Sequence, residues 1–266
     1  CVGAGERAAG VVLTSGEEIQ ARAVASNIPP KLLFRAYVPE GAISDQERAR
    51  FTGMKTGSGV FRMNVALSEL PDFTSRPGKT LQPHHASGIL VAPTMAYMEH
   101  AYWDARQHGG ARAPGVEMLI PSTLDDTLAP PGQHVASLFV QYVAPQLPKP
   151  RSWADPAEKE SFADLVIDTV AQHAPNFKSA VVARQVLSPL DLEQRFGLID
   201  GDIFHGQLGL GQLFSARPVL GAANYRMPVP GLYLCGSGAH PGGGVTGVPG
   251  MNAAREIARD LKLRRI

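Results

Sequence analysis

The segment 231–250 constrains this chain more than any other, because a short apolar run, 232–235, leads directly into a cluster of glycines. An apolar run of this length is typical of a strand buried on both faces, as in the parallel sheet of an α/β domain. Glycine lacks a Cβ, so a ligand can approach its backbone closely and a positive φ costs little. The glycines are Gly236, Gly238, Gly242, Gly243, Gly244, Gly247 and Gly250.

A helix is predicted to start near Val248 or Pro249, since proline suits the first turn of a helix. A strand, a glycine loop and a helix N-terminus together offer free N–H groups and a helix dipole to an anionic or electron-rich ligand. A tight strand-to-helix turn without a ligand is the alternative. Seven glycines within 15 residues, with His240 and Pro241 among them, favour the ligand site.

Four segments carry a family resemblance: 120–142, GDIFHG at 201–206, QLF at 212–214 with Arg217 and Pro218, and GLYLCGSGAHPGGG at 231–244. Together they resemble the carotenoid desaturase (phytoene dehydrogenase) superfamily of FAD-dependent oxidoreductases. They are most similar to the branch that contains pyridine nucleotide-disulfide oxidoreductase domain-containing protein 2. The resemblance extends over essentially all 266 residues.

The resemblance implies that FAD is the cofactor and that the glycine loop contacts it. His205 and His240 are the candidates for catalytic side chains, although a satisfied core histidine is the commoner situation for a residue such as His205. A catalytic triad is not required, because hydride passes from a substrate carbon to the flavin N5. The residues expected to bind the cofactor are Gly236, Ser237, Gly238, His240, Pro241, Gly242, Gly243, Gly244, Val245, Gly247 and Val248.

The dinucleotide-binding pattern GxGxxG following a strand is absent from the sequence, and the glycine-rich stretch 206–211 has the wrong spacing and context. Residue 1 is cysteine, without a signal-peptide pattern. We therefore expect the C-terminal portion of a longer flavoprotein, whose natural partner is its own missing N-terminal half and which does not retain FAD alone. Apolar sheet surface left uncovered by that loss would favour a homodimer.

The expected fold class is α+β, because strands and helices are mixed without regular βαβ repetition. Residues 1–38 are assigned to a remnant of the FAD domain, made of a hairpin turning at Ser15-Gly16 and a connecting strand. Residues 39–197 are assigned to a substrate domain with a mixed sheet and flanking helices. Residues 198–266 are assigned to the C-terminal part of a split FAD-binding α/β domain.

Several elements are predicted from local chemistry. Capping patterns at Ser44 and Asp155 and a threonine at position 94 predict helices over 45–52, 155–173 and 94–107. Apolar alternation predicts strands over 60–67, 89–92, 117–120, 135–143 and 180–187. The terminal helix is expected to bury a face made of Met251, Ala254, Ile257, Ala258 and Leu261, leaving Arg255, Arg259 and Asp260 largely outside it.

Composition excludes some classes of function. A net charge of +1 gives no basic or acidic bias toward nucleic acid. No apolar run approaches the ~20 residues of a membrane span. None of the eight histidines stands in a metal-ligand spacing, and His84 and His85 are expected to be solvated in a proline-flanked loop.

Two classes of function stay open. The first is a flavoenzyme that dehydrogenates or isomerises an apolar, isoprenoid or lipid-like small molecule. The second is a non-catalytic module that keeps the fold and acts through protein–protein contacts. The expected compartment is the cytoplasm, with peripheral membrane association or, in an animal, a mitochondrial location as alternatives.

Overall fold

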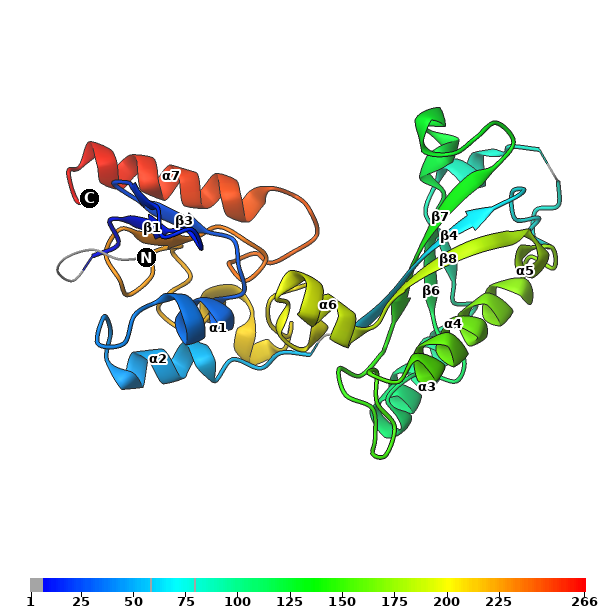
Figure 1. Ribbon diagram of the computed structural model, residues 1–266, viewed down its shortest axis with the longest axis horizontal. Helices are drawn as coiled ribbons and strands as arrows, with labels where there is room; N and C mark the ends of the chain where they lie inside the picture. Colours follow the sequence, from blue (N-terminus) through cyan, green and yellow to red (C-terminus); the bar gives the residue numbers. More distant parts are fainter. Residues whose placement is uncertain (1–6, 58, 79) are drawn as a thin grey trace. The chain divides into compact units, whose positions relative to one another are not determined.

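The computed structural model describes residues 7–57, 59–78 and 80–266, and the chain divides into two compact units (Figure 1). The terminal unit takes the chain up to residue 58 and again from 197 to 266. The central unit takes residues 59–196. The mixture of helices and sheets agrees with the predicted α+β class.

The central unit is built on a five-stranded antiparallel sheet with the order β5-β6-β7-β4-β8. Its strands are β4 (Val60–Leu67), β5 (Ile89–Val91), β6 (Val116–Leu119), β7 (His134–Gln141) and β8 (Val181–Leu187). Side chains alternate between the two faces of a strand, and in β4 Phe61, Met63 and Val65 are buried whereas Asn64 is exposed. One face of the sheet therefore forms the core.

Helices complete the central unit: α3 (Met95–His108), α4 (Pro156–Ala171), α5 (Phe177–Ala180) and α6 (Pro189–Phe196). The apolar stripe of α4, represented by Phe162, Val166 and Val170, packs in the same core as the buried residues of the sheet. Short 3-10 turns connect the elements: η2 (Pro83–Ala86), η3 (Pro121–Thr123) and η4 (Asp126–Leu128).

Local signals set these helix boundaries. The Thr94 hydroxyl accepts from the N–H of Tyr97 at 3.0 Å, and Gly109 ends α3 in the left-handed conformation. Asp155 accepts from the N–H of Ala157 at 2.9 Å and starts α4. The helices predicted over 94–107 and 155–173 are confirmed within one or two residues.

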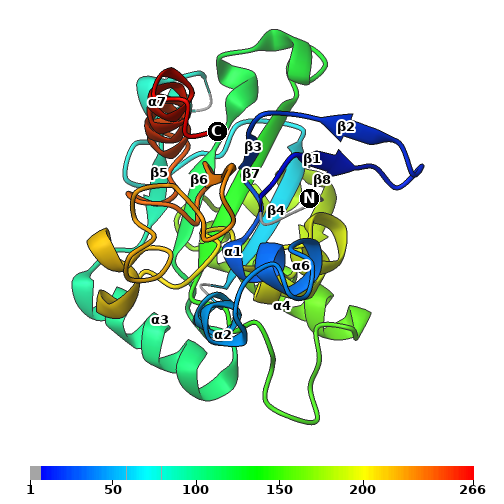
Figure 2. The same cartoon turned by 90° about the vertical axis from the view of Figure 1, so that its left-hand side faces the viewer.

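The terminal unit contains a hairpin and a parallel strand pair. β1 (Gly10–Val12) pairs antiparallel with β2 (Glu18–Gln20), and this hairpin is seen clearly in Figure 2. β3 (Val24–Ser26) pairs parallel with β9 (Leu232–Leu234). The helices are α1 (Pro30–Leu32), continued as a π-helix η1 (Leu33–Tyr37), α2 (Asp45–Thr52) and α7 (Val248–Lys262). The 3-10 turns are η5 (Ile199–Gly201), η6 (Leu210–Gln212) and η7 (Phe214–Ala216).

The division of the chain differs from the sequence-based boundaries at one point. Residues 39–58 lie in the terminal unit, whereas the sequence assigns them with the central residues. The reason is that α2 carries Phe51, whose ring stacks on Phe34 with centroids 3.9 Å apart in the core of the terminal unit. The second boundary, between 196 and 197, lies one residue from the sequence-based position.

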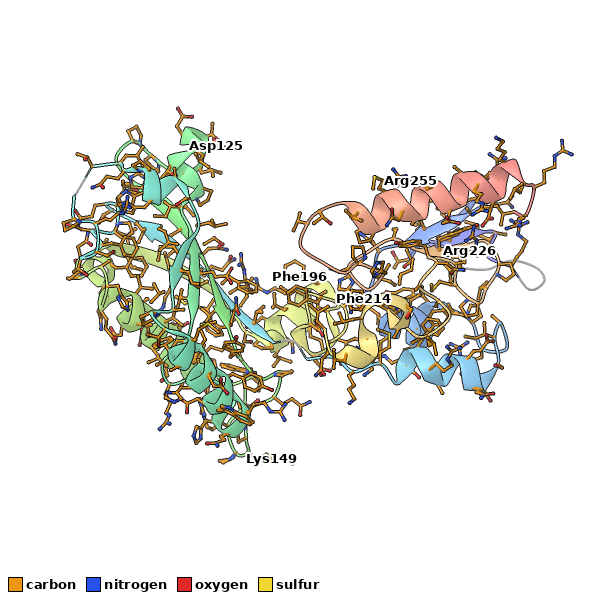
Figure 3. The ribbon with its side chains drawn as sticks, turned by 180° about the vertical axis from the view of Figure 1, so that it is seen from behind. Asp125, Lys149, Phe196, Phe214, Arg226 and Arg255 are labelled. Carbon is orange, nitrogen blue, oxygen red and sulfur yellow. The ribbon has the colours of Figure 1, made fainter. Side chains whose placement is uncertain are left out.

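The predicted buried face of α7 is wrong in part: Arg255 and Arg259 are exposed as expected and Ile257 and Leu261 are half-buried, but other positions differ. Met251 is 47% exposed and Ala254 and Ala258 are exposed, whereas Asp260 is only 2% exposed. The carboxylate of Asp260 can be buried because it accepts from Arg226 Nε at 2.6 Å and from the Tyr233 hydroxyl at 2.8 Å. Figure 3 shows Arg255 on the outer side of α7 and Arg226 beneath the helix.

Two other expectations also fail. His85 is fully buried rather than solvated, because its Nε2 lies 2.9 Å from the carbonyl oxygen of Pro71 and its Nδ1 accepts from Gln82. The apolar strand β9 is also covered within the terminal unit, so β9 itself offers no uncovered surface for a dimer.

No helix in the described part of the chain has both the length and the apolarity to cross a lipid bilayer.

Candidate functional site

The candidate site lies at the carboxyl edge of the parallel pair β3 and β9. Both strands run in the same direction, so the chain leaves both at the same edge, and the N–H of Cys235 bonds the carbonyl oxygen of Ser26 at 2.8 Å. Ligands of open α/β sheets bind beyond the carboxyl ends of parallel strands. We call residues 27–30, 203–217 and 235–247 the edge loops.

The buried guanidinium of Arg217 joins two of these segments, 203–217 and 235–247. Its Nη2 donates to the carbonyl oxygens of Ser237 at 2.8 Å and Phe204 at 2.5 Å, and its Nη1 donates to that of Gln212 at 3.3 Å. The side chain has no exposed surface, and burial lowers its pKa while the carboxylate of Asp202 opposes that shift. A buried cation with its donors satisfied by carbonyls fixes the loops and is not available to a ligand.

The loop glycines fall into two groups. In the first, the space for a side chain is already filled by the protein: a Cβ on Gly236 would overlap the backbone of Asn27, and one on Gly238 would overlap the ring of Pro30. A Cβ on Gly243 would lie 2.6 Å from the hydroxyl oxygen of Ser237. These three glycines are explained by packing within the terminal unit, without a ligand.

The second group faces open space. Gly244 and Gly247 have φ angles of 105° and 71°, and a Cβ on Gly247 would meet no atom within 4 Å. Between them Val245 is fully exposed and has a φ of 56°. A β-branched residue in the left-handed region is strained, and such strain is concentrated at functional sites. Residues 244–247 are therefore the part of the loop whose surface is free to meet a ligand.

His205 is brought to the edge loops and carries an unsatisfied nitrogen. Its Nδ1 is buried without a hydrogen-bond partner, and its backbone φ is 60°. Burial and the neighbouring Arg217 lower the pKa of His205 to about 4, so the imidazole is neutral near pH 7. A neutral ring with a free nitrogen can donate to or accept from a ligand.

His240 occupies the glycine loop itself. Its Nδ1 is also buried without a partner, and its ring lies 6.3 Å from that of Phe214, centroid to centroid. The following Pro241 is exposed, whereas Gly242 is buried with its would-be Cβ 3.6 Å from Arg217 Nε. Ser237 is half-buried beside them. The sequence-predicted site residues therefore lie on the edge loops, except Val248, which is the first residue of α7.

The N-terminus of α7 differs from the sequence-based expectation that its first N–H groups are free to bind a ligand. The N–H of Val248 donates to the Thr246 hydroxyl at 3.2 Å, and Pro249 has no N–H. The first two helical positions therefore offer no free donor. Behind the loop, Arg226 bonds both Glu256 and Asp260 of α7, which holds the helix on β9.

The described residues include no cluster of three or more His, Cys, Asp or Glu side chains placed to hold a metal ion. Cys235 is a free, half-buried thiol whose pKa is raised by burial.

Comparisons with known proteins identify the family. Pyridine nucleotide-disulfide oxidoreductase domain-containing protein 2 of Mus musculus is 45% identical over 260 residues, which are 96% of this chain and 45% of that protein. A phytoene desaturase (lycopene-forming) of Paracoccus sp. is 27% identical over 251 residues, 92% of this chain and 46% of that protein. No family model matches the sequence.

The chain belongs to the carotenoid desaturase (phytoene dehydrogenase-like) superfamily. The resemblance stated from the sequence is thereby confirmed. The crystal structure of an oxidoreductase from Methanosarcina mazei has the same fold, with a TM-score of 0.54 and 17% identity over 96% of this chain and 46% of that one. This member of the superfamily spans about half the length of the curated relatives it matches.

Sequence reasoning on this desaturase-like chain missed the role of Arg217. From the sequence, Arg217 stands out only within a segment that resembles the superfamily. The positions of its carbonyl partners follow no helical or strand periodicity. Its partners Phe204 and Ser237 lie 13 and 20 residues away along the chain.

Proposed function

We propose that the chain is part of a FAD-dependent oxidoreductase that dehydrogenates or isomerises an apolar small molecule by hydride transfer to FAD. The observation that carries the proposal is the parallel pair β3 and β9, whose carboxyl ends both continue into the edge loops. Membership of the superfamily supports it, since the curated relatives include oxidoreductases and desaturases.

The residues present fit one end of the cofactor. The segment 244–247 is exposed and its glycines meet open space, so a planar ring can approach the backbone there. The unsatisfied Nδ1 atoms of His205 and His240 are available to polar atoms of the cofactor or substrate. When bound, FAD supplies the hydride acceptor. Arg217 holds the loops in the shape that receives it.

We assign cofactor binding to the terminal unit and substrate binding to the central unit. In the central unit, the sheet face opposite the helical core exposes Leu90 and Leu119 and carries Arg62, whose guanidinium carbon lies 5.3 Å from the centroid of the Phe139 ring. The polar side chains of this face bond one another, as Arg62 does with Ser137 and Asn64 with Gln185, so its apolar side chains are left to contact an apolar substrate.

The pyrophosphate and adenosine of FAD require a further segment. GxGxxG after a strand is absent from the sequence, and its helix N-terminus is what holds the pyrophosphate in dinucleotide-binding units. We propose that a longer polypeptide supplies this unit and that residues 1–266 alone do not retain FAD. Contact with one end of the cofactor is too little to offset the cost of immobilising it.

One observation favours the non-catalytic alternative. Gly236, Gly238 and Gly243 are required by the packing of the terminal unit, so these glycines would persist in a module that binds no flavin. Gly244 and Gly247 face open space, so they are positions at which the flavoenzyme needs glycine for its ligand and the non-catalytic module does not.

The test is the visible spectrum of the full-length polypeptide that contains this chain, purified as wild type and as Gly244→Val. The wild type should be yellow, and Gly244→Val should lose flavin while keeping its fold. Gly41→Val is the matched control, because Gly41 lies in the same unit, has a φ of 79° and would meet no atom within 4 Å. Gly243→Val is unsuitable, since its side chain would collide with Ser237 and Phe204. A colourless wild type, or equal flavin content in both variants, would contradict the proposal.

A further inference from the structure

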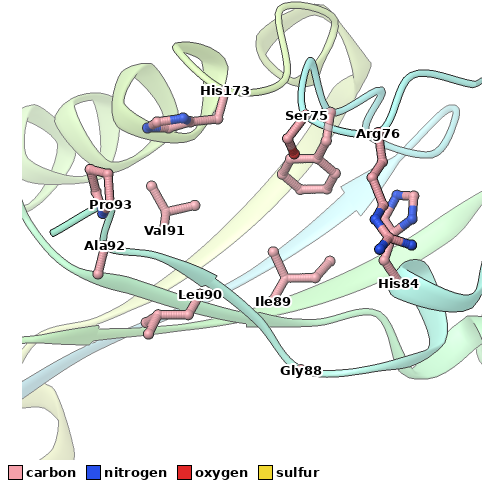
Figure 4. A pocket seen from close by; sticks show the side chains of 11 residues that line it. Ser75, Arg76, His84, Gly88, Ile89, Leu90, Val91, Ala92, Pro93 and His173 are labelled. Atoms are coloured by element: carbon pink, nitrogen blue, oxygen red, sulfur yellow. The ribbon is translucent and has the colours of Figure 1, made fainter.

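A second candidate site lies in the central unit, remote in sequence from the glycine loop. It is a surface cavity of about 350 Å³ (Figure 4). The loop 73–76, the turn η2, the edge strand β5 and His173, two positions after the end of α4, surround it. Its lining residues are Phe73, Ser75, Arg76, His84, Gly88, Ile89, Leu90, Val91, Ala92, Pro93 and His173.

One wall of the cavity is apolar. Ile89 and Val91 point into it from β5, whereas Leu90 between them points to the other side of the strand (Figure 4). The ring of Phe73, 6% exposed, adds to this wall. The alternation of β5 thus places two aliphatic side chains where the body of an apolar ligand can lie.

The polar groups gather at one end. Both ring nitrogens of His84 are buried and have no hydrogen-bond partner, while its ring packs against His85 with centroids 4.0 Å apart. Buried polar atoms are nearly always satisfied, so two unsatisfied nitrogens on one ring call for a partner. Burial, His85 and Arg76 lower the pKa of His84, which keeps the ring neutral with one N–H to donate.

Arg76 lies beside His84 (Figure 4), and within the described ranges its guanidinium has neither a hydrogen bond nor a carboxylate partner. None of the described residues that line the cavity is an aspartate or a glutamate. His173 lies at the opposite end, after the C-terminus of α4, where the helix dipole disfavours negative charge. We therefore expect the anionic group of a ligand to lie at the Arg76 end of the cavity and not at the His173 end.

We propose that this cavity binds a small amphipathic monocarboxylate, with the carboxylate on Arg76 and His84 and the apolar body along Phe73, Ile89 and Val91. Guanidinium and carboxylate match in a planar, two-pronged pairing, and the N–H of His84 supplies a further donor. A phosphate group is disfavoured, since among the described lining residues Arg76 alone carries a fixed positive charge and Phe73, Ile89 and Val91 are apolar.

The test is a titration of residues 1–266 with octanoate, followed by the NMR signal of the His84 ring and by calorimetry. Octanoate should bind saturably and shift that signal, whereas octan-1-ol and inorganic phosphate should bind at least about tenfold more weakly. Arg76→Gln should weaken octanoate by about tenfold or more, because it removes a charged donor pair. Arg106→Gln, at an exposed position of α3, should leave binding unchanged.

His84→Phe provides a second variant that keeps the ring packing but removes the nitrogens, and it should also weaken octanoate. Thermal unfolding of each variant checks that the fold is retained. The proposal is overturned if Arg76→Gln and Arg106→Gln bind octanoate equally, or if phosphate or octan-1-ol binds as tightly as octanoate.

Discussion

Arg217 donates a 2.8 Å hydrogen bond to the carbonyl oxygen of Ser237, and this contact ties the turn after η7 to the first residues of the glycine loop. The same guanidinium bonds the carbonyl oxygen of Phe204, next to His205. The two candidate histidines therefore occupy loops that a single buried cation holds together. Because the loops lack regular secondary structure, their shape depends on such side-chain bonds.

Replacing Arg217 by lysine should destabilise the terminal unit by about 3 kcal/mol. The compact ammonium of lysine lacks the planar fork that reaches the carbonyls of Phe204, Gln212 and Ser237, so buried acceptors are left unpaired. The free energy of unfolding in urea measures the loss. Arg255→Lys, at an exposed position of α7, is the control and should change stability by less than about 0.5 kcal/mol. Equal stability of both variants would refute the bridging role of Arg217.

His205 should make stability depend on pH below neutrality. Its folded pKa, about 4, lies below the usual 6.5, so the folded state binds the proton less well than the unfolded state. Stability is then lost as pH falls from about 6.5 toward 4, by up to about 3 kcal/mol. His205→Asn, which tolerates a positive φ, should lose less over this range. His100→Asn, at an exposed site, should behave as the wild type; parallel curves for all three proteins would contradict the assignment.

Asp260 should make the stability of the protein depend on pH in a lower range than His205 does, and here the charged form of the side chain is the stabilising one. Arg226 and Tyr233 lower the pKa of its carboxyl to about 2, so the stabilisation is complete above about pH 4 and is lost as pH falls toward 2. At neutral pH Asp260→Asn should cost about 2–3 kcal/mol, because Arg226 loses the buried one of its two charged partners and keeps only Glu256. The difference between wild type and variant in urea unfolding should shrink between pH 4 and 2. A difference that stays constant with pH would show that the carboxylate charge is not what matters.

Residues 1–266 alone should be colourless and dimeric. Strand β9 is covered, so it cannot cause self-association. The exposed apolar residues Leu210, Phe214 and Val245 of the edge loops are the candidates for a dimer contact. Large apolar side chains exposed on a soluble protein favour contact with another apolar surface. Phe214→Ser should shift the mass in sedimentation equilibrium toward the monomer, whereas Leu220→Ser, also exposed, should not. A wild-type monomer that carries one FAD would contradict both parts of this prediction.

The sequence by itself determined the elements whose signals are local. The caps Thr94, Asp155 and Ser44 act within one helical turn, and Gly109 stops α3 at the next residue, so these boundaries were predictable. The alternation of 60–67 predicted the extent of β4. The apolar run before the glycines likewise predicted β9, the loop and the start of α7.

Only the tertiary structure decided which polar groups are buried and why particular glycines are needed. Asp260 pairs with Arg226 across 34 residues of sequence, and this contact allows a carboxylate to be buried at a position of α7 that periodicity assigns to the outside. Gly236 is required because Asn27, at the end of a strand near the other end of the chain, lies against it. Helical and strand periodicity report the burial of apolar side chains, whereas a buried charge or a close backbone approach depends on partners that only the folded chain brings together.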